Sequence, residues 1–400
     1  MTMFGALSTI TQAKEILLSH SELLPVEEIE FDHLLHRFLR ENITATEDQP
    51  AFDKSALDGY ALSADSQEGR WKIVQEIPAG GKAEIALRAG ECARVLTGAL
   101  VPVGTAQVVA QEWVSKDALW IKLEKELKAP GIRRQGDDNR QGDILLRAGN
   151  RLGATELAVL AQQGVSHAIV SRHPRLIHLV IGDELVGPTE PTTGSSIRDT
   201  NSPLIAALAE EFHLPRLQSV RVKDDFSAAH AALEKLSWQE ADVLLISGGA
   251  GHGDRDISLP LLESLGFVSH IRGVNMRPGK PFTATFRKGQ AAFILPGNPV
   301  AHWVVWHVFV KTFLAEIMGA IMPSDTFPLS VAEDWSCGDD GRALRWPARV
   351  ETSPDGQVVR PLLLASSGDL SKLTGANALI HLSSGMAQLE KGDIVQVEWA

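Results

Sequence analysis

The feature that most constrains the fold of this chain is an alternation of short apolar runs with helical segments, which begins near residue 174 and continues to about residue 322. Short apolar runs predict buried strands, and longer stretches with helical periodicity predict the helices between them. Strands that alternate with helices form parallel sheets, whose ligands bind at the carboxyl ends of the strands. The predicted strands are Ile177–Ile181, Leu217–Val222, Val243–Ile246 and Ala291–Leu295, and the predicted helices are Ser202–Phe212, Phe226–Leu236, Leu259–Leu265 and a long helix after Pro299.

The rest of the chain differs in texture, and 400 residues are too many for one ordinary core. Helical spacing marks residues 8–41 and 153–164, whereas β-like runs between glycine and proline turns fill the stretch between them and return after residue 323. We therefore expect a multidomain α/β protein with a parallel-sheet core. The expected domains are a helical or linker domain of residues 1–42 plus 140–172, a β-rich domain of residues 43–139, an α/β domain of residues 173–322 and a C-terminal β domain of residues 323–400.

Composition narrows the functional class. The net charge of −12 argues against a general nucleic-acid binder, which needs a broad basic field. Two distant cysteines, Cys92 and Cys337, favour a reducing compartment over a disulfide framework. The N-terminal segment lacks the basic and apolar regions of a secretory signal, and the apolar stretch Ala301–Met322 contains charged residues that favour a buried helix over a membrane span. We expect a cytoplasmic protein with no membrane or nucleic-acid partner.

A glycine-rich segment, Ser247-Gly-Gly-Ala-Gly-His-Gly-Asp-Arg-Asp256, follows an apolar strand directly. Glycines allow successive backbone N–H groups to point at one spot, which suits a phosphate. The carboxylates of Asp254 and Asp256 could hold Mg²⁺ against that phosphate. A flexible strand-to-helix turn with no ligand is the alternative.

Two further segments favour anions. In Met276-Arg-Pro-Gly-Lys-Pro281 two cations bracket a rigid turn, so Arg277 and Lys280 can converge on one anionic group. In Leu295-Pro-Gly-Asn-Pro-Val300 we expect Asn298 to cap the following helix and Pro299 to occupy its first position, which exposes a helix N-terminus. A solvated basic turn and simple helix initiation are the alternatives.

Acidic residues mark two other places. Gly182-Asp183-Glu184 ends a predicted strand and therefore puts carboxylates at the rim of the sheet, where they could also serve only as helix caps. In the β-rich segment, Asp58 precedes Gly59 and Tyr60, the only tyrosine of the chain. This arrangement indicates a structured loop, although an Asp-Gly turn is the commoner meaning of the dipeptide.

Taken in order, these segments resemble the MoeA family of molybdenum-cofactor biosynthesis, which is related to the gephyrin E domain. The resemblance covers nearly the whole chain. Its matching segments are Asp53-Lys-Ser-Ala-Leu-Asp-Gly-Tyr-Ala, Arg94-Val-Leu-Thr-Gly-Ala, Ile132-Arg-Arg-Gln-Gly-Asp-Asp, Gly182-Asp-Glu-Leu, Asp199-Thr-Asn, Ser247-Gly-Gly, Met276-Arg-Pro-Gly-Lys-Pro, Leu295-Pro-Gly-Asn-Pro-Val and Ser367-Gly-Asp-Leu-Ser-Lys-Leu-Thr-Gly-Ala-Asn377.

The resemblance implies an elongated homodimer in which the β-rich domain projects from an α/β domain, with the active cleft between the α/β domain of one subunit and the β-rich domain of the other. It implies a transferase that cleaves adenylylated molybdopterin in the presence of molybdate and Mg²⁺ to give molybdenum cofactor and AMP. Docking with the pterin adenylyltransferase or with molybdoenzyme apoproteins is a further expectation.

The resemblance also implies roles for single residues. The catalytic set would be Asp58, Thr97, Glu184, Asp225, Asp256, Arg277 and Lys280, and the metal ligands would be Asp254, Asp256 and Glu184. The substrate-binding set would be Asp138, Asp183, Asn201, Ser247, Gly248, Gly249, Gly279, Pro296, Gly297, Asn298, Ser367 and Ser371.

Three positions depart from the family's pattern: Gly251 and Ala301 stand where the family commonly has serine, and Pro347 aligns with a family arginine. They leave open a diverged, catalytically weak paralogue that binds the pterin or serves as a scaffold. The retained charged residues favour the enzyme, and the β-rich segment argues against the related adenylyltransferase and the competence-damage pyrophosphatase, which lack it.

Overall fold

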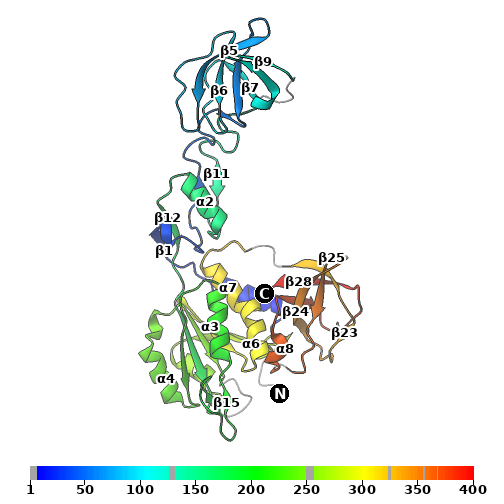
Figure 1. Ribbon diagram of the computed structural model, residues 1–400. Helices are drawn as coiled ribbons and strands as arrows, with labels where there is room; N and C mark the ends of the chain where they lie inside the picture. The colour runs from blue at the N-terminus through cyan, green and yellow to red at the C-terminus, as the bar shows by residue number, and fades with distance from the viewer. Residues whose placement is uncertain (1–6, 126–130, 249–255, 323–325, 355, 367) are drawn as a thin grey trace. The chain divides into compact units, whose positions relative to one another are not determined.

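The computed structural model describes residues 7–125, 131–248, 256–322, 326–354, 356–366 and 368–400. The chain forms two compact units (Figure 1). The smaller unit comprises residues 41–148 and 153–167 and contains the predicted β-rich segment. The larger unit comprises residues 1–40, 149–152 and 168–400, so the α/β and C-terminal β regions belong to the same unit.

The core of the larger unit is a six-stranded sheet among the described residues, with the order β16-β13-β17-β21-β20-β18. The first four strands run parallel, as the sequence predicts. Strand β20 pairs antiparallel with β21, and β18 pairs antiparallel with β20 at the edge of the sheet. The strands are β13 (Leu176–Ile181), β16 (Gln218–Val222), β17 (Val243–Ser247), β18 (Val268–Arg272), β20 (Thr283–Arg287) and β21 (Gln290–Leu295).

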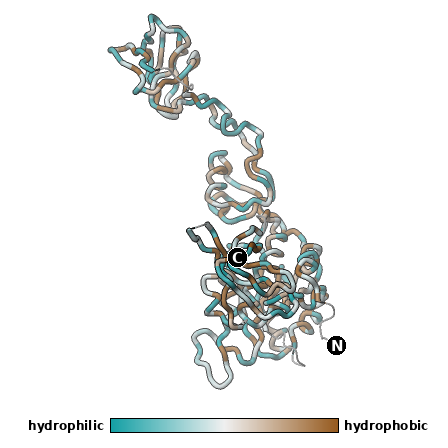
Figure 2. The backbone as a smooth tube through the Cα atoms, turned by 90° about the vertical axis from the view of Figure 1, so that its right-hand side faces the viewer, coloured by the Kyte–Doolittle hydropathy of each residue, from teal (hydrophilic) through white to brown (hydrophobic). Residues whose placement is uncertain are grey.

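Helices cover both faces of this sheet, because alternate strand residues are apolar on each side. Leu179 and Leu244 face the layer formed by α4 and α5, whereas Val243 and Leu245 face the layer formed by α1, α3 and the long helix after Pro299. Figure 2 shows the apolar segments gathered inside this unit. The helices are α1 (Ile10–Ser19), α3 (Asn201–Glu211), α4 (Phe226–Lys235) and α5 (Ser258–Ser264).

The long helix is continuous over Pro299–Ile317 and consists of α6 (Pro299–Val305), a π-helical segment η4 (Trp306–Val310) and α7 (Lys311–Ile317). By length and composition it could cross a membrane, but 83% of its apolar window is buried inside the protein. The prediction of a buried helix in this stretch is therefore confirmed.

The order of the strands fixes where a ligand can bind. After β13 the chain passes through α3 to β16 on one side and then returns to β17 on the other side of β13. The strand order therefore reverses between β13 and β17, and open α/β sheets bind ligands at the carboxyl ends of the strands at such a point. Gly182 and Gly248 follow directly after these two strands.

The C-terminal part of the larger unit is a second sheet, with the order β19-β24-β25-β22-β28-β26. Its edge strand β19 (Met276–Arg277) comes from the α/β region and pairs in parallel with β24, Met276 beside Ala343 and Arg277 beside Leu344. This pairing brings the C-terminal residues to the Arg277–Lys280 turn. The remaining elements are β22 (Phe327–Val331), β23 (Trp335–Ser336), β24 (Ala343–Ser353), β25 (Gly356–Pro361), α8 (Leu370–Leu373), β26 (Ala378–Leu382), β27 (Gln388–Leu389) and β28 (Ile394–Trp399).

The smaller unit is built on a sheet with the order β7-β4-β6-β5-β9-β8, together with the short ladders β10–β3 and β11–β2. Two small cores of buried apolar residues, around Ala93 and around Trp71, hold the sheet. Its elements are β2 (Ile43–Thr44), β3 (Lys54–Ser55), β4 (Gly59–Ser63), β5 (Arg70–Ile77), β6 (Glu91–Val95), β7 (Thr105–Ala110), η2 (Gln111–Trp113), β8 (Val114–Asp117), β9 (Trp120–Leu123), β10 (Ile132–Arg133), β11 (Ile144–Leu146) and α2 (Ala154–Gln162).

The prediction of helices throughout residues 8–41 is only half right. After α1 the chain forms the strand β1 (Val26–Glu30), which pairs with β12 (His167–Ser171), and the short 3₁₀ turn η1 (Phe31–His33). A helix cannot continue here because His36 has a φ of +68°, in the left-handed region. Two leucines after η1 are buried outside any helix: Leu34 and Leu39 have no exposed surface.

Candidate active site

A pocket of about 580 Å³ lies in the larger unit at the carboxyl ends of β13, β17 and β21, where the C-terminal sheet faces them. Most of the sequence-predicted residues of the larger unit that the structure describes line it. They are Glu184, Gly248, Arg277, Gly279, Lys280, Pro296, Gly297 and Asn298. The pocket therefore occupies the position that the parallel strand order indicates.

Gly248 is required at the end of β17. Its φ is +83°, and a Cβ atom at this position would overlap the carbonyl oxygen of Ile181 on β13. Only glycine combines this backbone conformation with so close an approach. The backbone of Gly248 thereby forms part of the pocket wall.

The turn after β19 carries two cationic side chains to the pocket. Gly279 has a φ of +114°, and a Cβ there would lie 2.6 Å from Met276 Cε and 2.9 Å from Val305 Cγ2. This tight turn holds Arg277 and Lys280 in the lining of the same pocket. The sequence-based expectation that the two cations lie at one site is consistent with this geometry.

Arg277 is fixed by the C-terminal sheet. Its guanidinium donates to the carbonyl oxygen of Gly338, lies 3.7 Å from an Asp340 carboxylate oxygen and stacks over Trp346 at 5.8 Å from the ring centroid. Asp340 also forms a hydrogen-bonded ion pair with Arg342. The hydrogen bond from Arg342 is the main reason why the pKa of Asp340 is lowered from its ordinary value. One carboxylate therefore orients two guanidinium groups at the edge of the pocket.

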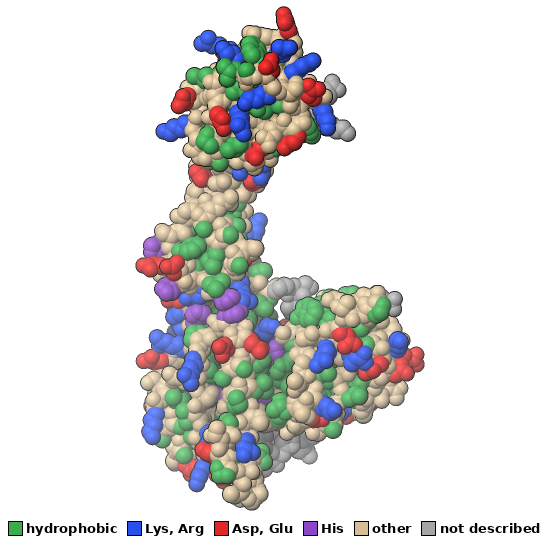
Figure 3. All heavy atoms as spheres, viewed as in Figure 1, with side chains coloured by type: hydrophobic (Ala, Val, Ile, Leu, Met, Phe, Trp, Pro, Cys, Tyr) green, Lys and Arg blue, Asp and Glu red, His purple; other side chains and the backbone are tan. Residues whose placement is uncertain are grey.

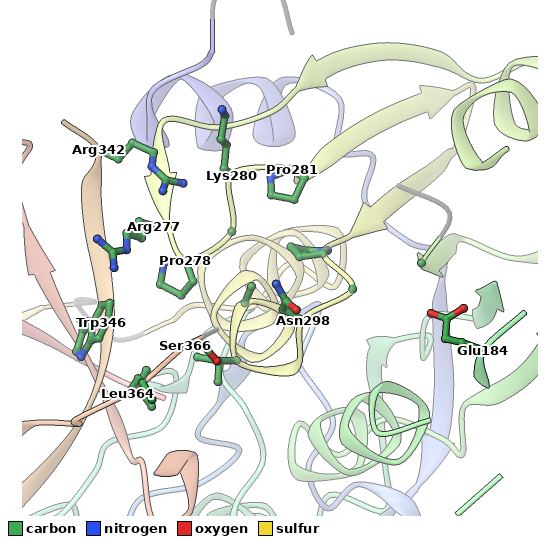
Figure 4. A pocket seen from close by; sticks show the side chains of 17 residues that line it. Glu184, Arg277, Pro278, Lys280, Pro281, Asn298, Arg342, Trp346, Leu364 and Ser366 are labelled. Atoms are coloured by element: carbon green, nitrogen blue, oxygen red, sulfur yellow. The ribbon is translucent and has the colours of Figure 1, made fainter. Parts of the chain in front are cut away.

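The pocket has an uneven distribution of charge. Figure 4 shows Arg277, Arg342 and Trp346 on one side, Glu184 on the opposite side and Asn298 between them. The side chains of Arg277 and Arg342 are 30% and 25% exposed, so both can reach a ligand while they stay partly desolvated. Three cationic side chains around one cavity are suited to an oxyanion with more than one negative charge.

The loop between β21 and α6 forms the floor of the pocket. Asn298 is the N-cap residue of α6 and Pro299 occupies its first position, as the sequence predicts. Asn201, at the start of α3, donates from Nδ2 to the carbonyl oxygen of Gly297 at 2.8 Å. Asn201 thus supports the loop from outside and is not part of the pocket lining.

Several predicted site residues that do not line the pocket form hydrogen bonds beside it. Asp225 is the N-cap of α4, where its Oδ1 accepts from the backbone N–H of Ala228 at 2.7 Å. Asp183 and Asp224 accept hydrogen bonds from each other's backbone N–H. These carboxylates stabilise the strand ends and the helix start beside the pocket.

Three other predicted residues also lie outside the lining. Asp256 accepts from the backbone N–H of Ser258 at the start of α5, and Ser371 donates to Asp369. Ser247 has no exposed surface, and its hydroxyl contacts two buried histidines, His178 and His302. The Ser247 side chain therefore faces the interior of the α/β domain.

In the smaller unit the structure brings two predicted residues together. Asp58 Oδ1 accepts from the backbone N–H of Thr97 at 2.7 Å and from its hydroxyl at 2.8 Å. These hydrogen bonds, the backbone one first, lower the pKa of the exposed Asp58 carboxyl from its ordinary value. Asp138 forms an ion pair with Arg133 elsewhere in the unit.

Gly249, Asp254 and Ser367 lie outside the described residues, as does the departure at Gly251. Within the part of the chain that the structure describes, no group of three or more histidine, cysteine or acidic side chains is placed to hold a metal ion. The predicted set of three metal ligands includes Asp254, so the described residues do not test it.

Two pocket residues, Arg342 and Trp346, were not predicted from the sequence. Pro347, which aligns with a family arginine, is flanked by Arg345 and Arg349, but neither lines the pocket. Partial burial lowers the pKa of Arg345 to about 10, and Arg349 donates to the carbonyl oxygens of Thr374 and Gly375. Only the pairing of β19 with β24 identifies Arg342 as the C-terminal arginine of the pocket.

On the face drawn in Figure 3, basic and acidic side chains are interspersed over the coloured surface. The positive charge that an anionic ligand requires is instead gathered locally, in the pocket. The pocket thus gathers cationic side chains although the net charge of the protein is −12.

Three family models match the chain: the MoeA N-terminal region (domain I and II) at residues 8–164, the probable molybdopterin binding domain at residues 177–316 and the MoeA C-terminal region (domain IV) at residues 336–399. A molybdopterin molybdenumtransferase of Nostoc sp. is 33% identical over 375 residues, covering 90% of this chain and 86% of the relative. One of Staphylococcus epidermidis is 29% identical over 394 residues, covering 96% and 93%.

The crystal structure of the molybdopterin biosynthesis MoeA protein from Pyrococcus horikoshii OT3 superimposes with a TM-score of 0.82 at 25% identity, covering 98% of this chain and all of the other. The fold, the order of the motifs and the matched relatives agree. The chain belongs to the MoeA family of molybdopterin molybdenumtransferases.

Proposed function

We propose that this protein is a molybdenum insertase, which cleaves adenylylated molybdopterin in the presence of molybdate and Mg²⁺ and releases molybdenum cofactor and AMP. The observation that carries the proposal is the convergence of Arg277, Lys280 and Arg342 on one pocket at the point where the strand order reverses. Both substrates are oxyanions, and the pocket gathers positive charge in a protein whose net charge is −12.

The cations act by neutralising charge. Cleavage of a phosphoanhydride needs little covalent chemistry from the protein, so catalysis depends on positioning and on electrostatic stabilisation of the oxygens that gain charge. Arg277 and Arg342 can each offer two N–H groups to a tetrahedral oxyanion, whereas Lys280 offers a point charge. Because Asp340 and Trp346 hold the guanidinium groups in place, little reorganisation is needed when the ligand binds.

The carboxylates near the pocket are chemically suitable ligands for a magnesium ion, because Mg²⁺ prefers oxygen ligands. Proteins commonly bind it through one or two carboxylates together with substrate phosphates. Glu184 lines the pocket and Asp256 precedes α5, so these two residues would hold the ion. When bound, the ion would neutralise charge on the phosphate groups.

Asp58 belongs to the proposal as well. Its carboxylate is exposed and is oriented by two hydrogen bonds from Thr97, which is the arrangement of a side chain held ready for a ligand. We further propose that the protein is a cytoplasmic homodimer. Its partners would be the pterin nucleotide, molybdate and either the adenylyltransferase or molybdoenzyme apoproteins.

The test is to incubate the purified protein with adenylylated molybdopterin and to follow AMP release with and without molybdate and Mg²⁺. Release that requires both supports the insertase. The Arg342→Ala variant should lose at least about tenfold in kcat/KM, because one removed charge-stabilising contact costs this much or more. Tight pterin binding by the wild-type protein without AMP release would instead identify a diverged paralogue that carries or senses the pterin.

A further inference from the structure

A row of hydrogen-bonded polar side chains runs across the α/β sheet from the exposed Ser219 to three buried residues. Ser219 Oγ on β16 lies 3.2 Å from His178 Nδ1 on β13, and His178 Nε2 lies 2.6 Å from Ser247 Oγ on β17. Ser247 Oγ lies 3.4 Å from His302 Nε2 on α6, and His302 Nδ1 lies 3.0 Å from the carbonyl oxygen of Pro296. His178, Ser247 and His302 have no exposed surface.

The chemistry of the last acceptor fixes the protons along the row. A carbonyl oxygen only accepts, so the proton of neutral His302 is on Nδ1 and its Nε2 must accept from the Ser247 hydroxyl. Ser247 Oγ in turn accepts from His178 Nε2–H, which leaves His178 Nδ1 to accept from the Ser219 hydroxyl. Burial lowers the pKa of His178 to about 3 and that of His302 to about 4, so both rings are neutral near pH 7.

The row contacts the backbone of the pocket at two places. Ser247 directly precedes Gly248, and Pro296 directly precedes Gly297 and Asn298; all but Ser247 line the pocket. His302 lies one helical turn after Asn298, whose carbonyl oxygen accepts from the His302 backbone N–H at 2.9 Å. His302 therefore links the end of β17 to the end of β21 through its two ring nitrogens.

We propose that His302, supported by His178 through Ser247, is a positioning residue that fixes Gly248, at the end of β17, and the Pro296–Asn298 loop relative to each other. Neither ring lines the pocket, so neither touches a substrate, and their effect is exerted through the backbone of Gly248 and of Pro296–Asn298. This inference rests on the proposed function, because these backbone segments are held for the oxyanion that the pocket binds. It also gives a role to His302, which follows the departure from the family's pattern at Ala301.

Two substitutions at His302, by asparagine and by leucine, test this role, because the two new side chains have nearly the same shape. His302→Asn keeps a donor close to the Nδ1 position, so it can still bond the Pro296 carbonyl oxygen, whereas His302→Leu removes every polar atom. His307→Phe is the matched control, because His307 is buried on the same helix but its ring nitrogens have no hydrogen-bond partner. A displacement of about 1 Å at a reacting group can lower a rate by about a hundredfold.

We expect His302→Leu to lower kcat for AMP release by about tenfold to a hundredfold with a smaller change in KM. His302→Asn should restore most of that loss, and His307→Phe should keep the wild-type kcat. Wild-type kcat in His302→Leu, or a loss that the asparagine variant does not reduce at all, would overturn the proposal.

A second measurement does not depend on the reaction. Backbone hydrogen exchange, followed by mass spectrometry in peptides that cover residues 243–248 and 295–301, should be faster in His302→Leu than in the wild type and in His307→Phe. Unchanged exchange in both peptides would refute the positioning role even if the wild type proves to be an active insertase. Faster exchange in a protein that releases no AMP would support the positioning role and reject the proposed function alone.

Discussion

His307 offers a direct way to measure what a buried imidazole costs this protein. The side chain is 5% exposed, packs against Trp303 with ring centroids 4.4 Å apart, and lines a second cavity of about 370 Å³. Neither of its ring nitrogens has a hydrogen-bond partner, and burial together with the charge of Lys311 lowers its pKa to about 3. The change His307→Phe keeps a ring beside Trp303 and removes both polar atoms.

The sign of the pH effect follows from the two pKa values. The unfolded chain takes up a proton on this histidine near pH 6.5, whereas the folded protein does so only near pH 3. Between these values the unfolded state binds more protons, so stability is complete above pH 6.5 and is lost as the pH falls. From pH 7 to pH 5 this histidine should lower the free energy of unfolding by about 2 kcal/mol.

The assay is urea unfolding of wild type and His307→Phe at pH 7 and pH 5, with exchange of the exposed His33 for glutamine as the control. At pH 7 the variant should be at least as stable as wild type, because a buried polar group without a partner costs about 1–3 kcal/mol. At pH 5 the advantage of the variant should be larger by about 2 kcal/mol. A difference that stays the same at both pH values would show that the imidazole is solvated or charged in the folded protein, and the reasoning would be refuted.

Three other perturbations have clear expected outcomes. Lys280→Met should lower kcat/KM for AMP release by about a hundredfold, measured against Lys288→Met, which removes an exposed lysine from the turn between β20 and β21. Gly248→Ala should be destabilised by more than about 3 kcal/mol in urea unfolding, because its Cβ would overlap the Ile181 carbonyl oxygen, whereas Gly194→Ala, with open space around its Cβ, should lose about 1 kcal/mol. Excess chelator should abolish AMP release and added Mg²⁺ should restore it; full turnover in chelator would remove the metal from the proposal.

The α/β core could be predicted because its signal is local. Each parallel strand is a short apolar run, and each run is separated from the next by a helix, so the sequence pattern predicts the four strands β13, β16, β17 and β21 and their parallel direction. The antiparallel strands β18 and β20 were missed. Val268–Arg272 includes exposed and polar residues, and its place in the sheet depends on pairing with Thr283–Arg287.

In the candidate site, too, the residues in local motifs were predicted and a residue placed by pairing between distant segments was not. Arg277, Lys280 and the Pro296–Asn298 loop were predicted because each lies in a compact motif at a strand end. Arg342 was missed because it reaches the pocket through the pairing of β19 with β24, between segments more than 60 residues apart in the chain. The resemblance places Asp225 in the catalytic set, and the structure shows that its side chain caps α4.

The central claim is that the pocket bounded by Arg277, Lys280 and Arg342 binds an oxyanion of the reaction. Its most direct test is a crystal of the protein soaked in molybdate, with data collected at the molybdenum absorption edge. We predict an anomalous peak within hydrogen-bond reach of at least two of these three side chains, which disappears in crystals of Lys280→Met. A molybdenum peak elsewhere in the protein, with none in this pocket, would contradict the account.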